Sequence, residues 1–227
     1  MYYYYLSDWI YILPGLLLGL WAQYKVKSAY SHYARVRSAS GRPASEVAED
    51  LLSRNGNGGV RVERIPGTLT DHYDPRSEVL RLSEGVYDSS SLAALGIAAH
   101  EAGHAMQKLE EYGPMKLRTA ILPVVTLSSQ LYFPLFLAGF IFSWEPLLFA
   151  GIVFFAVSVV FSLITLPVEF NASSRAMALL ESGGYITRDE APGVKKVLDA
   201  AALTYVAAAV TAILQLLRLL ALSSRRR

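Results

Sequence analysis

Two long apolar segments that lie almost end to end constrain the fold of this chain more than any other feature. They run from about residue 119 to 142 and from about 147 to 168, and neither contains a charged residue. Each exceeds the roughly 20 residues with which an α-helix crosses the hydrocarbon core of a bilayer. Because only residues 143–146 separate them, we expect residues 118–168 to form a transmembrane helical hairpin that leaves one membrane surface and returns to it.

A third apolar run lies near the N-terminus. It extends from Trp9 to Tyr24, follows four consecutive tyrosines and ends in aromatic residues. Aromatic side chains at both ends of an apolar run are typical of the two interfaces of a bilayer. The segment lacks the basic leading region and the small-residue cleavage site of a signal peptide. We therefore expect residues 1–24 to be a retained transmembrane anchor.

Charge next to the apolar runs predicts the orientation of the chain. Five basic residues follow the anchor closely: Lys25, Lys27, Arg35, Arg37 and Arg42. The positive-inside rule places the region that they open in the cytosol and the N-terminus outside. The C-terminal segment, residues 201–227, contains a last apolar run from about Ala201 to Leu222 that is long enough to span. A fourth span would nevertheless leave Arg225–Arg227 outside, against that rule. Two alternatives therefore stay open for it, a transmembrane helix or a helix at the interface.

Composition agrees with a membrane protein and limits the chemistry. Hydrophobic residues make up 53% of the chain and charged residues 18%, and a net charge of +2 gives no argument for nucleic-acid binding. The chain has no cysteine, so any metal ion must be held by His, Asp or Glu.

Residues 25–117 have the character of a soluble region. A short amphipathic helix is expected from Glu46 to Arg54. Apolar and polar residues then alternate in Val60–Ile65 and again in Glu78–Leu82, which predicts strands. We expect these strands to form a small antiparallel sheet, followed by a helix from about Ser90 to Leu109.

That helix contains the segment His100-Glu101-Ala102-Gly103-His104, an HExxH motif. Residues four apart lie on the same face of a helix, so both imidazoles can reach one metal ion while Glu101 stands beside them. Two neutral imidazoles suit Zn²⁺, and a glutamate can take a proton from zinc-bound water. Because so short a pattern also arises by chance, two buried and hydrogen-bonded histidines are the alternative.

Glu169 is the first charged residue after the hairpin. An even number of crossings returns it to the membrane surface that carries the HExxH helix. A carboxylate in the first turn of a helix is also stabilised by the helix dipole. The residues alone therefore leave open whether Glu169 binds a metal or only begins the helical region expected over residues 169–200.

Several segments taken together resemble a known family. They are Asp71–Pro75, Val79–Ser83, Ala98–Ala105 and Val168–Ala176. In these segments, and over nearly its whole length, the chain is similar to the neutral zinc metallopeptidases of bacterial membranes (zinc peptidase type 2), which share their plan with the CAAX prenyl proteases. The resemblance implies one Zn²⁺ per chain, held by His100, His104 and Glu169. This chain departs from the pattern at one position. The CAAX prenyl proteases usually have an aspartate where this chain has Ser173.

Four further residues are secondary candidates around the predicted zinc site. With Ser173 in place of an aspartate, Asn171 or Arg175 is expected to support the ligands instead. Arg175 could also neutralise Glu169 or bind an oxyanion. His72 is a candidate ligand or supporting residue and Tyr87 a candidate oxyanion donor. A histidine in a loop and an aromatic residue in the core are the alternative interpretations.

The sequence therefore predicts a mostly α-helical integral membrane protein with three to four transmembrane helices, a small antiparallel β element and a cytosolic HExxH helix. The expected activity is that of a zinc endopeptidase in a bacterial cell membrane, with Glu101 as general base and polypeptides, membrane proteins among them, as substrates. An edge strand near Val79–Leu82 is expected to pair with extended substrate. The alternative is a non-catalytic membrane scaffold or metal-binding protein. A site inside the bilayer is disfavoured because polar residues follow His104 closely.

Overall fold

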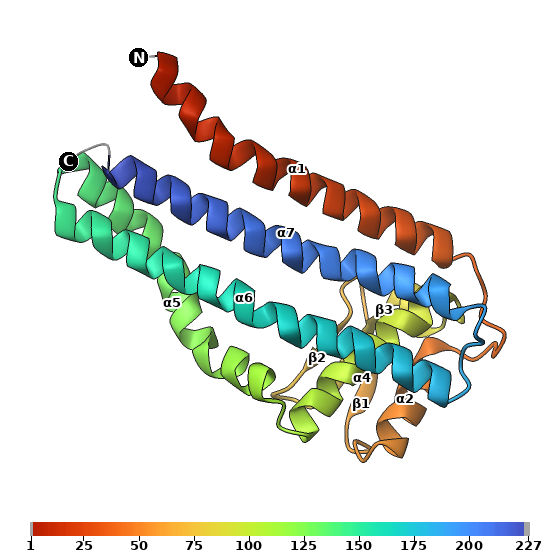
Figure 1. The fold of residues 1–227 in the computed structure, drawn as a ribbon. Coiled ribbons are helices and arrows are strands. Elements are labelled where there is room, and N and C mark those ends of the chain that lie inside the picture. Colours follow the sequence, from red (N-terminus) through yellow and green to blue (C-terminus); the bar gives the residue numbers. More distant parts are fainter. Residues whose placement is uncertain (1, 225–227) are drawn as a thin grey trace. The chain divides into compact units, whose positions relative to one another are not determined.

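The computed structural model describes residues 2–224, which are mostly helical (Figure 1). In chain order the elements are α1 (Tyr2–Tyr33), α2 (Ala44–Arg54), β1 (Arg61–Ile65), β2 (His72–Asp74), β3 (Val79–Ser83), α3 (Glu84–Tyr87), α4 (Leu92–Leu109), α5 (Gly113–Ile141), α6 (Glu145–Ser182) and α7 (Ala191–Ser224). They form two compact units. The helical unit comprises the described parts of residues 1–22, 116–167 and 204–227, and the mixed unit comprises residues 23–115 and 168–203.

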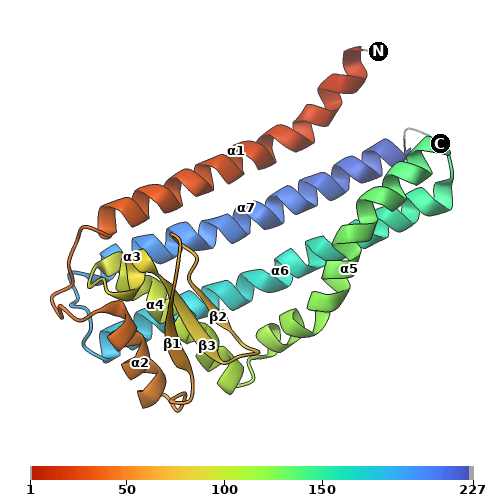
Figure 2. The same ribbon diagram turned by 180° about the vertical axis from the view of Figure 1, so that it is seen from behind.

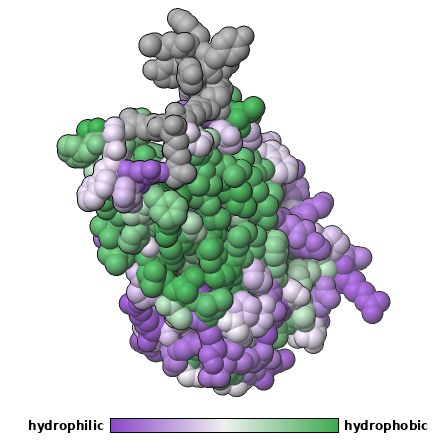
Figure 3. All heavy atoms as spheres, turned by 60° about the vertical axis from the view of Figure 1, so that its left-hand side comes forward, coloured by the Kyte–Doolittle hydropathy of each residue, from purple (hydrophilic) through white to green (hydrophobic). Residues whose placement is uncertain are grey.

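Three helices with residues in the helical unit are long and apolar enough to cross a membrane within the described chain: α5, α6 and α7. Many of their large apolar side chains are exposed, including Leu122, Val124, Leu127, Phe133, Val153, Val160 and Leu163. Figure 3 shows a broad hydrophobic area on the surface. An apolar surface of this extent is unfavourable in water and suits lipid. Residues 1–24 remain a predicted anchor, within which Trp9 and Leu17 are exposed.

The last apolar run forms part of a single helix. Helix α7 is 34 residues long, and by length and composition it fits the transmembrane alternative for this run. Arg225–Arg227, which conflict with a fourth span, lie outside the described residues.

Helices α5 and α6 form a closely packed hairpin joined by residues 142–144. A Cβ atom on Gly139 would lie 2.3 Å from the backbone nitrogen of Leu148, and one on Gly151 would lie 2.6 Å from that of Phe136. Each helix therefore contributes a glycine at which the backbone of the other approaches. Small residues at such crossings let membrane helices pack closely without a hydrophobic driving force.

The mixed unit contains a three-stranded sheet in the order β1-β3-β2 (Figure 2). Strand β3 runs parallel to β1 and antiparallel to β2, so the prediction of an antiparallel sheet was wrong for its two main strands. The reason is β2, which lies between them in sequence and reverses the chain once more before β3 begins. The predicted edge strand, Val79–Leu82, is consequently the central strand, and β1 and β2 form the edges.

Helix α4 lies at the centre of the mixed unit and agrees closely with its predicted range. Ser91 caps it by accepting a hydrogen bond from the backbone N–H of Ala94. Most of its residues are buried, and many are alanine or glycine. These small side chains let neighbours approach: a Cβ on Gly103 would lie 2.9 Å from the backbone oxygen of Ala172 in α6. The core around α4 therefore holds α6 against the HExxH segment.

Candidate metal centre

Two histidines of α4 and one glutamate of α6 meet within the mixed unit. The Nε2 atoms of His100 and His104 lie 3.3 and 3.5 Å from Oε2 of Glu169. One potential ligand atom from each of the three residues lies within 4.8 Å of the others. The structure thus brings together the three residues predicted as metal ligands, in an arrangement that could hold one ion.

The surroundings of the cluster favour a bound cation. Glu169 is only 2% exposed, and a buried carboxylate is costly unless positive charge or hydrogen bonds compensate it. Burial alone would lower the pKa of His104, but the hydrogen bond to Glu169 and the charges of Glu101 and Glu169 outweigh it, so the net shift is upward. The local field therefore stabilises positive charge. Two imidazole nitrogens and one carboxylate oxygen match the donor set of a catalytic zinc site.

Glu101 is fixed by the edge strand beside α4. Its Oε2 atom accepts a hydrogen bond of 2.9 Å from the backbone N–H of Tyr73 in β2. Glu101 follows His100 directly in α4 and acts electrostatically on His104. A carboxylate held next to a metal site can serve as a proton acceptor.

Gln107 supports His104 and was not identified from the sequence. It is fully buried, and its Oε1 atom lies 2.9 Å from Nδ1 of His104. Its Nε2 atom donates to the backbone oxygen of Val168 at 2.8 Å and to Oδ1 of Asn171 at 3.0 Å. One amide group therefore orients a histidine of α4 and ties it to α6. The sequence contained a signal for this contact, because Gln107 stands three residues after His104 and residues three apart in a helix are neighbours.

Asn171 and Arg175 extend this network outward. The Nε atom of Arg175 donates to Oδ1 of Asn171 at 2.7 Å. Its two terminal nitrogens bind the carboxylate of Glu110 at 2.8 and 2.7 Å, and this contact lowers the pKa of Glu110. Asn171 thus contacts the support of His104, whereas the charged end of Arg175 is engaged by a surface carboxylate.

Ser173 supports His100 despite the missing aspartate. Its Oγ atom lies 3.2 Å from Nδ1 of His100, the ring nitrogen opposite the one that faces Glu169. A hydroxyl at this distance can accept the N–H of the imidazole and fix its orientation. The carboxylate usual in the relatives is therefore replaced by a neutral group at the same position. Asn171 contacts Gln107, the support of the other histidine.

The two remaining candidates contact other parts of the mixed unit. The Nδ1 atom of His72 lies 2.9 Å from the backbone oxygen of Thr70, and its Nε2 atom is 3.4 Å from the guanidinium group of Arg81. Tyr87 is partly buried and packs against the hydrophobic core. Among the described contacts, neither side chain joins the histidine and glutamate cluster.

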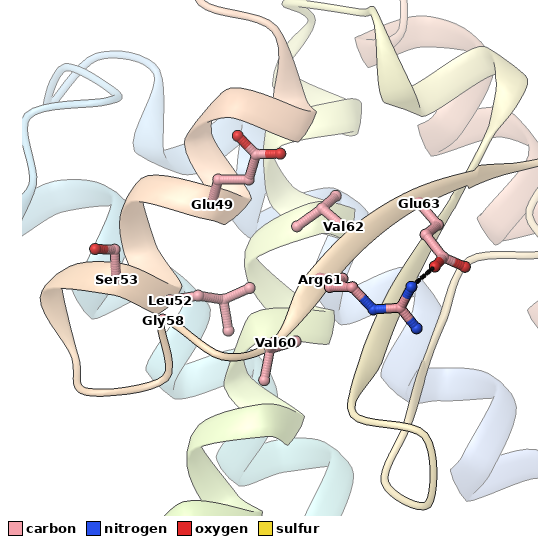
Figure 4. A pocket seen from close by; sticks show the side chains of 8 residues that line it. All are labelled: Glu49, Leu52, Ser53, Gly58, Val60, Arg61, Val62 and Glu63. Carbon is pink, nitrogen blue, oxygen red and sulfur yellow. Dashed lines mark ion pairs between the residues drawn. The ribbon is translucent and has the colours of Figure 1, made fainter.

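A cavity of about 610 Å³ lies elsewhere in the mixed unit, between α2 and β1 (Figure 4). It is lined by Glu49, Leu52, Ser53, Gly58, Val60, Arg61, Val62 and Glu63. Arg61 and Glu63 form an ion pair of 3.0 Å along its rim. None of the predicted site residues lines this cavity.

Comparisons with known proteins agree with the chemistry of the cluster. The model of a family described as "Putative neutral zinc metallopeptidase" matches residues 8–224. A curated relative, the "Putative membrane protease YugP" of Bacillus subtilis (strain 168), is 50% identical over 206 residues, which cover 91% of this chain and 92% of the relative. No solved structure matches the chain significantly.

Proposed function

This chain belongs to the family of putative neutral zinc metallopeptidases, and on that premise we propose that it is a membrane-bound, zinc-dependent endopeptidase. The observation that carries the proposal is the buried carboxylate of Glu169, which lies within 3.5 Å of both histidines of the HExxH segment. His100, His104 and Glu169 would hold one Zn²⁺. The chemistry that zinc supplies in such a site is polarisation of a carbonyl group and activation of water.

Glu101 is the proposed general base. Tyr73 holds its Oε2 atom, which leaves Oε1 to take a proton from water and to return it to the leaving amine. A carboxylate fixed at one oxygen loses little freedom in the reaction, because its orientation is already set. Gln107 and Ser173 hold the Nδ1 atoms of His104 and His100, so that both Nε2 atoms face the metal position.

Strand β2 is the proposed approach for substrate. It is an edge of the sheet, and Tyr73 within it contacts Glu101. An extended polypeptide that approaches such an edge can pair with it through backbone hydrogen bonds. The proposed substrates are therefore unfolded or extended polypeptides, with membrane proteins among them.

The proposed location is the bacterial cell membrane, with the metal centre facing the cytosol. Three apolar helices support insertion in a lipid bilayer. The orientation is supported by the five basic residues between Lys25 and Arg42, because positively charged segments are retained on the cytosolic side.

The decisive experiment measures zinc and hydrolysis on the same detergent-purified protein. We expect about one zinc per chain and cleavage of an unfolded polypeptide. Glu101→Gln should keep the zinc and the thermal unfolding temperature but lose about 10²- to 10⁴-fold in rate, because the amide preserves shape and cannot accept the proton. Bound zinc without cleavage would support the non-catalytic alternative. Equal cleavage rates for the natural protein and Glu101→Gln would show that Glu101 is not the general base.

A further inference from the structure

Glu169 is tied to the membrane by a very short stretch of chain. The uncharged residues 147–166 suffice to cross the roughly 30 Å hydrocarbon core at 1.5 Å per residue, and Glu169 is the second residue after Pro167. Even a fully extended chain advances at most about 3.6 Å per residue. The Cα atom of Glu169 therefore lies within about 7 Å of that of Pro167, however α6 bends there.

A second connection leads to the same level. A Cβ atom on Gly96 of α4 would lie 3.0 Å from Val194 and 4.0 Å from Leu198 of α7. Gly96 stands one helical turn before His100, and Leu198 stands two residues before the uncharged run of α7 begins at residue 200. The helix that carries both histidines is therefore held against α7 just before that helix becomes apolar.

The residue next to the buried ligand is also suited to lipid. Phe170 directly follows Glu169 and is 49% exposed. An aromatic ring exposed at this point is unfavourable in water, whereas the boundary between headgroups and acyl chains accepts it. The short link to Pro167, the contact of α4 with α7 and the exposed ring of Phe170 thus support a cluster close to the surface of the bilayer.

We propose that the metal cluster works at the level of the lipid headgroups and that its substrates are polypeptides anchored in the same membrane. The bond that is cut should lie within about 10 residues of the anchor. A few extended residues, at about 3.6 Å each, already cover the roughly 7 Å between Pro167 and Glu169, and a longer spacer only lowers the effective concentration of the segment. This inference rests on the proposed endopeptidase function and specifies its substrate class.

A membrane-level site predicts a particular dependence on spacer length. When an anchor and a site lie at the same level, the effective concentration of a flexible segment falls roughly as the −3/2 power of its length. For a site far from the membrane, the cleavage rate should instead rise with spacer length at short lengths, since a short spacer cannot reach the site. The length dependence of the cleavage rate therefore distinguishes the two geometries.

The test uses the full-length protein reconstituted in lipid vesicles with single-span model substrates. One cleavable segment follows the span after Gly/Ser spacers of about 5, 15 or 30 residues, and a fourth substrate lacks the span. We expect the shortest spacer to be cut fastest, the longest on the order of tenfold more slowly, and the unanchored segment slowest of all. Glu101→Gln serves as the inactive control.

Two kinds of result would overturn the inference while leaving the enzyme intact. One is cleavage of the longest spacer with resistance of the shortest. The other is an equal rate for all anchored substrates, or for anchored and unanchored substrates at the same total concentration. If no substrate is cut faster by the natural protein than by Glu101→Gln, the proposed peptidase function itself fails.

Discussion

The Nε2 atom of His100 lies 3.3 Å from Oε2 of Glu169, although the two residues stand 69 positions apart in the sequence. All of α5 and the apolar part of α6 lie between them. The contact therefore depends on the tertiary fold, which must return the chain to α4 after a long apolar excursion. The first three predictions address how this contact is maintained.

Each of the three cluster residues should be required for metal. Replacing His100, His104 or Glu169 by Ala should lower bound zinc from about one to well below one per chain, because two ligands rarely hold zinc tightly. Metal analysis after gel filtration measures the content. The matched control is His72→Ala, which removes a histidine that contacts Thr70 and Arg81 and should leave the zinc in place. Full zinc content in Glu169→Ala would exclude Glu169 as a ligand.

Gln107→Ala should weaken zinc binding by about 10- to 100-fold, because His104 loses the group that orients its ring. Gln107→Glu is the informative companion, since a carboxylate still accepts the N–H of His104 but cannot donate to Val168. Zinc affinity should therefore largely survive in Gln107→Glu while stability falls. Competition with a chelator and thermal unfolding separate the two effects. Equal zinc affinity in Gln107→Ala and the natural protein would show that Gln107 does not position the ligand.

Gly103→Ala should force α4 and α6 apart. The added Cβ would lie 2.9 Å from the backbone oxygen of Ala172, which cannot move aside as a flexible side chain could. We expect a loss of about 1 to 3 kcal/mol in the free energy of unfolding and a reduced zinc content. Gly19→Ala in α1 is the matched control. No neighbouring atom of the described residues lies within 4 Å of the position that its Cβ atom would take. Similar stability of the two variants would contradict the close packing described for α4.

Acid should weaken the link between α2 and the segment after α6. Tyr185 donates to Asp50 at 2.5 Å and Arg42 donates at 2.9 Å, and these contacts lower the pKa of Asp50 to about 2. Because the folded pKa is below the unfolded value, the stability from this carboxylate is complete above pH about 4 and is lost as the pH falls towards 2.

Tyr185→Phe removes the main donor to Asp50 and should therefore lose less stability between pH 5 and pH about 3 than the natural protein does. Urea unfolding in detergent at the two pH values measures the difference. Tyr24→Phe, at a side chain that is 68% exposed, is the control. An identical acid response in Tyr185→Phe and the natural protein would show that this hydrogen bond does not set the pKa of Asp50.

The orientation in the membrane can be tested because the chain has no cysteine. Single cysteines at Ser53, Trp144 and Arg188, which are all exposed, report on the regions between α1 and α5, between α5 and α6, and between α6 and α7. With a membrane-impermeant thiol reagent on intact cells, we expect labelling at position 144 alone, because the positive charges keep the other two segments inside. Labelling at 53 and 188 without 144 would reverse the orientation. Labelling at only one of 53 and 188 would place the predicted ligands on opposite sides.

The sequence predicted those elements whose signals are local. Helix α4 agrees with its expected range because a cap and a helical repeat define it. Helices α5 and α6 contain the two expected apolar spans, because apolar length alone defines a span. However, α6 continues through Glu169 to Ser182, so the expectation of a separate helix over residues 169–200 was wrong. The sheet was mispredicted because the relative direction of β1 and β3 depends on β2. This strand has three residues, which are too few to show an alternation of apolar and polar residues.

The supports of the cluster were harder to predict than its members. His100 and His104 follow from helical spacing, whereas the position of Glu169 came from a resemblance and the return of the hairpin. Arg175 was expected near the ligands, but Glu110, which is 65 residues away in sequence, engages its charge. Gln107 was missed because a buried amide carries no charge and belongs to no short motif. Its partners in α6 are visible only once the two helices are packed.

The distance in sequence between the ligands also governs when the cluster can form. The histidines leave the ribosome before Glu169 has been synthesised, and His100 precedes it by 69 positions. All of α5 and the first part of α6 must then be synthesised before Glu169 can reach α4. A nascent chain that ends before residue 169 consequently contains two histidines without their third partner. The order of synthesis thus prevents the proposed zinc site from forming on the early chain.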